Sequence, residues 1–306
     1  MLEALLAAGV TPHILVGTSI GSVNAAFLAA DPSIERAREL SALWRRLSAE
    51  EFFPLNPALV ARAVLQGAVF SPEPLRRLIE REIPYRRVEE AAVPLRIVAT
   101  RCERRAGQPA VSLHSVAAGL DRRAGQAAVP LRLVAARLER TVEQAGIPLR
   151  IVTARFERRT QVLFAEGSVV DALMASCALP LVFPPYRIAD QVYVDGGLSE
   201  YVPLLPALRE GARVVYVLSL GAAHEHRGGP PSPRARVYRS LGNRFWRRTG
   251  LDLERQRADH PEVRVVELPA PLTRVGLRDF SRLGELIDHA REQTERFLDS
   301  DLGRTA

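Results

Sequence analysis

Residues 13–26 read HILVGTSIGSVNAA, and this stretch decides the fold. It opens with a short apolar run, which predicts a buried strand, and it closes with small residues that favour a helix. Between these two parts, residues 17–21 form a Gly-x-Ser-x-Gly sequence around Ser19. Strand, Gly-x-Ser-x-Gly and helix in this order are typical of a nucleophile elbow, a sharp turn that presents a serine hydroxyl. We therefore predict that Ser19 is a nucleophile.

The residues beside Ser19 support this interpretation. Gly17 and Gly21 leave room for a sharp turn, and the helix that starts at Ile20 directs its N–H groups and the positive end of its dipole toward Ser19. Such a serine loses its proton more readily, and the N–H of Ile20 can stabilise an oxyanion. Gly-x-Ser-x-Gly alone is a weak signal in a chain with 20 glycines, so the interpretation depends on the flanking strand and helix.

Composition limits the class of protein. The 306 residues suffice for one large domain or two small ones, and 47% apolar and 25% charged residues are typical of a globular protein. Two cysteines, Cys102 and Cys177, are too few for a disulfide framework and suit a reducing compartment. The net charge of +7 comes from scattered arginines, often beside acids, in a sequence without lysine, so we expect no nucleic-acid partner.

Targeting signals are not expected either. The opening segment carries Glu3 where a secretory leader would carry basic residues, and no apolar run is long enough to span a bilayer. We expect a cytoplasmic protein with peripheral contact to a membrane surface. The basic helical region at 237–257 could make that contact, although a core-facing helix with a basic rim explains it equally well.

Strands and helices alternate along the chain, which predicts an α/β fold with a mainly parallel sheet, in one domain over residues 1–306. The clearest buried strand is expected at 214–220, and a short strand at 192–194 leads into Asp195. Sites form at the carboxyl ends of strands in such sheets, so Ser19 and Asp195 are expected to share one. Helices are expected over residues 2–8, 34–47, 58–66, 75–82, 168–178, 205–210 and 280–298.

A tandem repeat occupies residues 93–164. The segment VPLRIVATR at 93–101 recurs with small changes at 129–137 and 147–155, and a degraded copy starts at residue 111, so the copies start 18 residues apart. A solenoid is not favoured, because neither glycines nor apolar positions recur every six residues. We expect the fourth copy, 147–155, to form a central strand, because it continues into residues 160–165, which can pair back with it.

Three motifs in one order carry a family resemblance: VGTSIGSVNAA at 16–26, ASCALPLVFPP at 175–185 and YVDGG at 193–197. Together they resemble the bacterial patatin-like phospholipases, from residue 1 to about residue 220. The resemblance implies a three-layer α/β/α fold with a mainly parallel sheet. It also implies a serine acyl hydrolase that cleaves phospholipid or lysophospholipid esters with a Ser–Asp dyad, without metal or cofactor.

Carried over by motif, Ser19 is the nucleophile and Asp195 is the general base. A carboxylate partly withdrawn from water beside a serine can accept its proton, so we expect an Asp195 oxygen within about 4 Å of the Ser19 hydroxyl. Gly196 and Gly197 let the backbone pass close to the nucleophile.

The family places a glycine-rich oxyanion loop before the helix that corresponds to residues 2–8. The 306 residues begin inside this helix, so we expect an N-terminally truncated chain in which Ile20 is the obvious oxyanion donor. Loss of one donor can slow such a reaction about a hundred- to a thousandfold, and slow ester hydrolysis is therefore expected.

Other functions stay open from the sequence. A Ser–His–Asp hydrolase would use His260 or His289 as its base, although its elbow normally follows several strands. A non-catalytic lipid-binding or interaction protein derived from the hydrolase is the other alternative. The His-Glu-His sequence at 224–226 has no third ligand nearby and is not expected to bind metal. Cys177 is expected to be a small buried residue.

Overall fold

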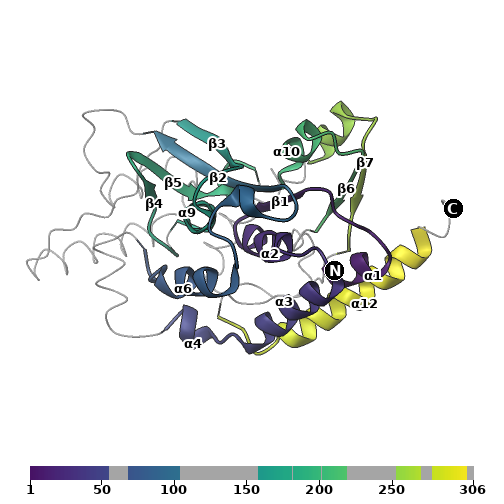
Figure 1. The fold of residues 1–306 in the computed structure, drawn as a ribbon, viewed down its shortest axis with the longest axis horizontal. Coiled ribbons are helices and arrows are strands. Elements are labelled where there is room, and N and C mark those ends of the chain that lie inside the picture. Colours follow the sequence, from purple (N-terminus) through teal and green to yellow (C-terminus); the bar gives the residue numbers. More distant parts are fainter. Residues whose placement is uncertain are drawn as a thin grey trace, which may run out of the picture.

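Strand β2, Leu95–Glu103, lies at the centre of the main sheet (Figure 1). The computed structural model describes residues 1–54, 68–103, 158–180, 182–200, 202–218, 253–269 and 278–301. The other strands of this sheet are β1 (Leu15–Thr18), β3 (Arg158–Phe164), β4 (Tyr186–Ile188) and β5 (Gln191–Asp195). A separate parallel pair is formed by β6 (Val214–Val217) and β7 (Arg264–Glu267).

The predicted α/β class is confirmed, but the sheet is partly rather than mainly parallel. β1 pairs with β2 in parallel, whereas β3 and β5 pair with β2, and β4 with β5, antiparallel. One reason is the two-residue connection between β4 and β5, at Ala189 and Asp190. So short a connection permits a hairpin and cannot cross over to a parallel neighbour.

β1 and β5 lie end to end along the same edge of β2. β3 pairs with residues 97–103 of β2, which places it on the opposite edge from both. β1 runs with β2 and ends with Thr18 opposite Val98, whereas β5 runs against β2 and ends with Asp195 opposite Ala99. The carboxyl ends of these two strands therefore meet, and the residues that follow Thr18 come face to face with Asp195.

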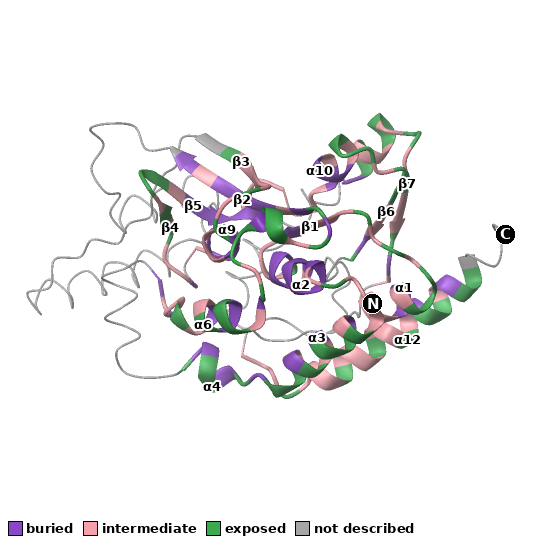
Figure 2. Cartoon of the chain, viewed as in Figure 1, coloured by how far each residue is buried: buried purple, intermediate pink, exposed green. Residues whose placement is uncertain are grey.

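Helices lie on both faces of the sheet. Leu95, Ile97 and Ala99 are fully buried, and they share one face because side chains alternate along a strand. The apolar core on this face is completed by α2 (Ile20–Ala29), α3 (Ile34–Arg46), α6 (Glu73–Glu82) and α9 (Val169–Ser176) (Figure 2). On the other face, Arg96 forms an ion pair of 2.6 Å with Glu210, which caps α10 (Leu204–Arg209).

Most helices begin and end within a few residues of the predicted bounds, because their caps are local. Ser33 starts α3 by accepting the N–H of Arg36, and Ser168 starts α9 by accepting that of Asp171, each at 3.2 Å. Further described helices are α1 (Leu2–Ala7), α4 (Ala49–Phe52) and α12 (Leu283–Asp301), and residues 253–259 are also helical. Short 3-10 turns occur at Val88–Glu90 and Gly196–Leu198. The predicted helix at 58–66 lies outside the described residues.

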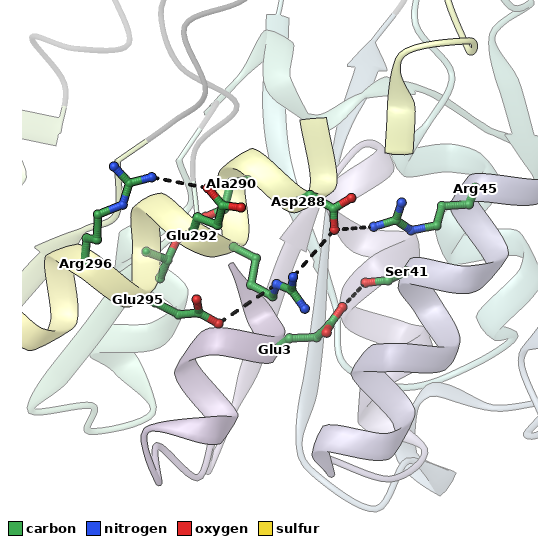
Figure 3. A network of polar contacts seen from close by, with 10 residues as sticks. Glu3, Ser41, Arg45, Asp288, Ala290, Glu292, Glu295 and Arg296 are labelled. Atoms are coloured by element: carbon green, nitrogen blue, oxygen red, sulfur yellow. Dashed lines mark hydrogen bonds and ion pairs between the residues drawn. The ribbon is translucent and has the colours of Figure 1, made fainter. Parts of the chain in front are cut away.

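Polar side chains connect α1 to α3, and α3 to α12 (Figure 3). The Ser41 hydroxyl of α3 donates to Glu3 of α1, and Arg45 of α3 lies 2.6 Å from Asp288 of α12. Exposed pairs of this kind add little stability, so the apolar contact beneath them matters more. There, Leu5 of α1 packs with Leu298 of α12. The two ends of the described chain therefore pack together.

The structure contradicts the prediction about the repeat. The first copy forms the central strand β2, whereas we expected the fourth copy, 147–155, which lies outside the described residues. Thr100 provides a physical reason. Its buried hydroxyl donates to the Asp195 carbonyl oxygen at 2.9 Å. The later copies carry Ala136 and Ala154 at the corresponding positions and could not make this hydrogen bond.

A second prediction was wrong about burial. Residues 214–220 were expected to contain the clearest buried strand, but β6 ends at Val217 and Val214 is 47% exposed. Within the described part of the chain, β6 pairs with β7 alone, whereas β2 has neighbours on both edges. β2 is the better buried strand for that reason.

Two expectations concerned membranes: that no segment spans a bilayer, and that the region at 237–257 contacts a membrane surface. None of the described helices combines the length and the apolar character needed to cross a bilayer. The basic region at 237–257 lies largely outside the described residues, so its predicted contact with a membrane surface stays a prediction.

Candidate active site

Ser19 occupies a strained turn between β1 and α2. Its φ of 54° and ψ of −136° are unusual for a residue with a side chain and cost about 1–3 kcal/mol, so its surroundings must hold it there. Its N–H donates to the Ser176 hydroxyl oxygen at 2.9 Å. Its carbonyl oxygen accepts the N–H and the hydroxyl of Ser22, at 2.8 and 2.6 Å. This geometry is the elbow that the sequence predicts.

Gly17 is the glycine that this turn requires. A Cβ atom at Gly17 would lie 2.3 Å from the Cα atom of Ser22, closer than real contacts allow. A Cβ atom at Gly21, in the first turn of α2, would meet nothing within 4 Å. The predicted steric role in the turn is therefore supported at Gly17 and not at Gly21.

The Ser19 hydroxyl is directed at Asp195. Ser19 Oγ donates to Asp195 Oδ2 at 2.5 Å, inside the distance of about 4 Å expected from the sequence. The other carboxylate oxygen, Oδ1, accepts the N–H of Gly197 at 2.8 Å. Asp195 is only 3% exposed, so these two donors replace most of its hydration.

Burial also changes the basicity of Asp195. Loss of hydration raises its pKa from 3.8 to about 6, while the hydrogen bonds from Ser19 and from the N–H of Gly197 oppose the rise. A carboxyl group with this pKa is mostly ionised at neutral pH and is more basic than an exposed aspartate. It is suited to accept a proton from the serine that it contacts.

The backbone around Asp195 packs tightly against β2. A Cβ atom at Gly196 would lie 2.2 Å from the carbonyl oxygen of Val98, so no side chain fits between the two segments. Thr100, two positions after Val98 in β2, holds the same turn because its hydroxyl donates to the Asp195 carbonyl oxygen. Gly196 thus has a steric role, and Gly197 contributes the N–H that binds the carboxylate.

Three supporting residues were missed by the sequence analysis: Ser22, Thr100 and Ser176. All three are fully buried hydroxyl residues. Ser176 had a weak signal, because it stands in an apolar helical segment where a buried hydroxyl needs a partner. Only the structure shows that its partners are the backbones of Ser19 and Val98.

The Ser–His–Asp alternative gains no support from the described residues. The hydrogen bond of the Ser19 hydroxyl goes to Asp195. His260 Nδ1 lies 3.2 Å from Glu262 Oε1, at a partly exposed position. His289 belongs to α12, which packs against α1 and α3.

Other reactive groups do not form a second centre in the described part of the chain. No cluster of three potential metal ligands occurs there, and residues 224–226 lie outside it. Cys177 is buried, as expected, and burial raises the pKa of its thiol well above the ordinary value.

A family comparison agrees with this geometry. The model of the patatin-like phospholipase family matches residues 1–208, more than half of the chain. The chain belongs to the patatin-like phospholipase family. This confirms the resemblance seen in the sequence, and the matched part of this patatin-like chain contains both Ser19 and Asp195. Membership implies a lipid acyl hydrolase. None of the curated proteins matches the sequence significantly.

Proposed function

We propose that this patatin-like chain hydrolyses phospholipid or lysophospholipid esters with Ser19 as the nucleophile and Asp195 as the general base. The observation that carries the proposal is the 2.5 Å hydrogen bond between the Ser19 hydroxyl and the buried Asp195 carboxylate. Family membership supports the lipid class of the substrate.

The reaction follows from this pair. As Ser19 Oγ attacks the ester carbonyl carbon, its proton passes to Asp195 Oδ2. Collapse of the tetrahedral intermediate breaks the ester bond, and the leaving alcohol takes the proton from Asp195. Water then loses a proton to Asp195 and attacks the acyl-serine. The fatty acid departs, and Ser19 recovers its proton from Asp195.

The start of α2 supports stabilisation of the tetrahedral oxyanion. Ser19 is the residue that precedes this ten-residue helix, so the positive end of the helix dipole lies beside the reacting carbon. The Ser19 N–H is already bonded to Ser176. The N–H of Ile20, which no bond within the helix can satisfy, is the donor that we assign to the oxyanion.

Covalent labelling tests the nucleophile directly. We expect a fluorophosphonate probe to modify residues 1–306 at Ser19, found by peptide mapping, and to leave Ser19→Ala unmodified. One turnover suffices for labelling, so slow hydrolysis does not hide the result. Ser281→Ala is the control, because Ser281 is exposed in the turn before α12 and should not change labelling. Labelling at another residue would contradict the assignment, and no labelling at all would indicate a non-catalytic lipid-binding protein.

The pKa of Asp195 predicts the pH dependence of hydrolysis. Below about pH 6 the carboxyl group is protonated and cannot accept the Ser19 proton. We expect kcat/KM for a p-nitrophenyl ester to rise about tenfold per pH unit up to a midpoint near pH 6, and to level off above it. A rate that stays constant from about pH 4.5 to pH 8, measured on protein that remains folded, would exclude Asp195 as the base.

A further inference from the structure

Ser176 connects the elbow to the central strand. It is the last residue of α9 and is fully buried. Its hydroxyl oxygen accepts the N–H of Ser19 at 2.9 Å, and its proton is donated to the carbonyl oxygen of Val98 at 2.6 Å. A hydroxyl has one proton and can also accept, so the two bonds use complementary capacities of one group. A single side chain thus joins three segments that are far apart in sequence.

The position of this side chain fits a role in orientation. Val98 is the residue of β2 opposite Thr18, so Ser176 anchors the elbow to the strand on which β1 already lies. The hydrogen bond to Ser176 holds the backbone N–H of Ser19, the residue with the positive φ. This nitrogen is bonded to the Cα atom that carries the Ser19 side chain. Ser22 holds the carbonyl side of the same residue. With both sides held, Ser19 Oγ points to Asp195 Oδ2.

We propose that Ser176 is a positioning residue for ester hydrolysis: its hydroxyl fixes the Ser19 backbone so that the nucleophile stays aligned with its base. The inference rests on the proposed role of Ser19 and deepens it. The Ser176 hydroxyl bonds the backbones of Ser19 and Val98, whereas the Asp195 carboxylate accepts from the Ser19 hydroxyl and the N–H of Gly197. Ser176 also holds the Ser19 N–H away from the oxyanion and leaves that task to the N–H of Ile20.

Ser176→Ala tests the proposal, because it removes both hydrogen bonds and leaves the space almost unchanged. We expect kcat for a p-nitrophenyl ester, and the rate of fluorophosphonate labelling at Ser19, to fall about 10- to 100-fold, while KM changes less than about twofold. A misaligned Ser19 donates a weaker hydrogen bond to Asp195, and that bond holds the Asp195 pKa down. The midpoint of the pH–rate profile should therefore move upward.

Thr294→Val is the matched control for loss of stability. Thr294 is a fully buried hydroxyl residue that donates to the Ala290 carbonyl oxygen at 2.7 Å, and its helix, α12, packs against α1 and α3. It should lower the unfolding temperature and leave kcat and the pH midpoint unchanged. Ser176→Cys has nearly the same shape and forms weaker hydrogen bonds, so it should give an intermediate kcat. It also carries the test if Ser176→Ala does not fold.

The proposal is overturned if folded Ser176→Ala, or Ser176→Cys in its place, keeps the kcat and pH midpoint of the unaltered chain. It is also overturned if Thr294→Val loses kcat to the same extent, since general destabilisation would then explain the effect. Retained activity in Ser19→Ala would instead contradict the proposed function, so the two failures are distinguishable.

Discussion

Asp195→Asn is expected to remove most ester hydrolysis and, at pH 8, to make the fold more stable. Asparagine has almost the same shape, and its oxygen can still accept the N–H of Gly197. Its NH₂ group, however, donates to Ser19 Oγ and cannot take the hydroxyl proton. General-base catalysis contributes about a hundred- to ten-thousandfold, and we expect a loss of kcat in this range.

The gain in stability follows from the raised pKa of Asp195. A folded-state pKa of about 6 against an unfolded value of 3.8 means that the folded protein binds the proton more tightly. At pH 8 both states are ionised, and the buried charge lowers the free energy of unfolding by roughly 3 kcal/mol. A buried amide also loses hydration, so Asp195→Asn should recover about 1–2 kcal/mol of this. The gain should disappear as the pH falls from about 6 toward 3.8.

Urea unfolding at several pH values, alongside ester turnover, checks both effects. Asp190→Asn makes the same chemical change at an exposed residue of the β4–β5 turn, and it should alter neither activity nor stability appreciably. An Asp195→Asn protein that keeps its activity would exclude Asp195 as the base. The burial argument would be contradicted if the stability of Asp195→Asn, relative to that of the unaltered chain, were lower at pH 8 than at pH 4.

Gly196→Ala is expected to destabilise the protein by about 3 kcal/mol or more. The new Cβ atom would lie 2.2 Å from the Val98 carbonyl oxygen and 3.1 Å from Thr18 Cγ2. Val98 belongs to the central strand and is fully buried, so its backbone cannot retreat without disturbing its pairing with β1. Any shift at Gly196 also moves Asp195, and hydrolysis should fall with stability.

Gly21→Ala is the control for this prediction. Its Cβ atom would meet nothing within 4 Å, and alanine favours a helix interior, so stability should stay equal or rise by about 0.5–1 kcal/mol. Thermal unfolding of both variants gives the comparison. Equal unfolding temperatures for Gly196→Ala and the unaltered chain would show that the turn after Asp195 can move away from β2.

The sequence by itself determined the local elements and predicted which residues form the candidate site. The turn at Ser19, the caps at Ser33 and Ser168, and the Asp-Gly-Gly turn at Asp195 each contain a hydrogen bond between residues a few positions apart. Such short-range geometry is encoded where it occurs. The resemblance to the patatin-like phospholipases, confirmed by the family match, rests on the segments around Ser19 and Asp195 and on residues 175–185.

Only the tertiary structure decided how these parts meet. β1 and β5 lie along one edge of β2 and run toward each other, because β1 is parallel and β5 antiparallel to β2. The expectation of a mainly parallel sheet did not include this arrangement. The tertiary structure also decided which repeat copy forms β2: in the first copy the Thr100 hydroxyl donates to the Asp195 carbonyl oxygen, a hydrogen bond to backbone distant in sequence. The partners of Ser176 were also decided by the tertiary structure. A buried hydroxyl needs a hydrogen-bond partner, but Ser19 lies 157 positions away in the sequence. Only the packing of the sheet and helices brings the two residues together.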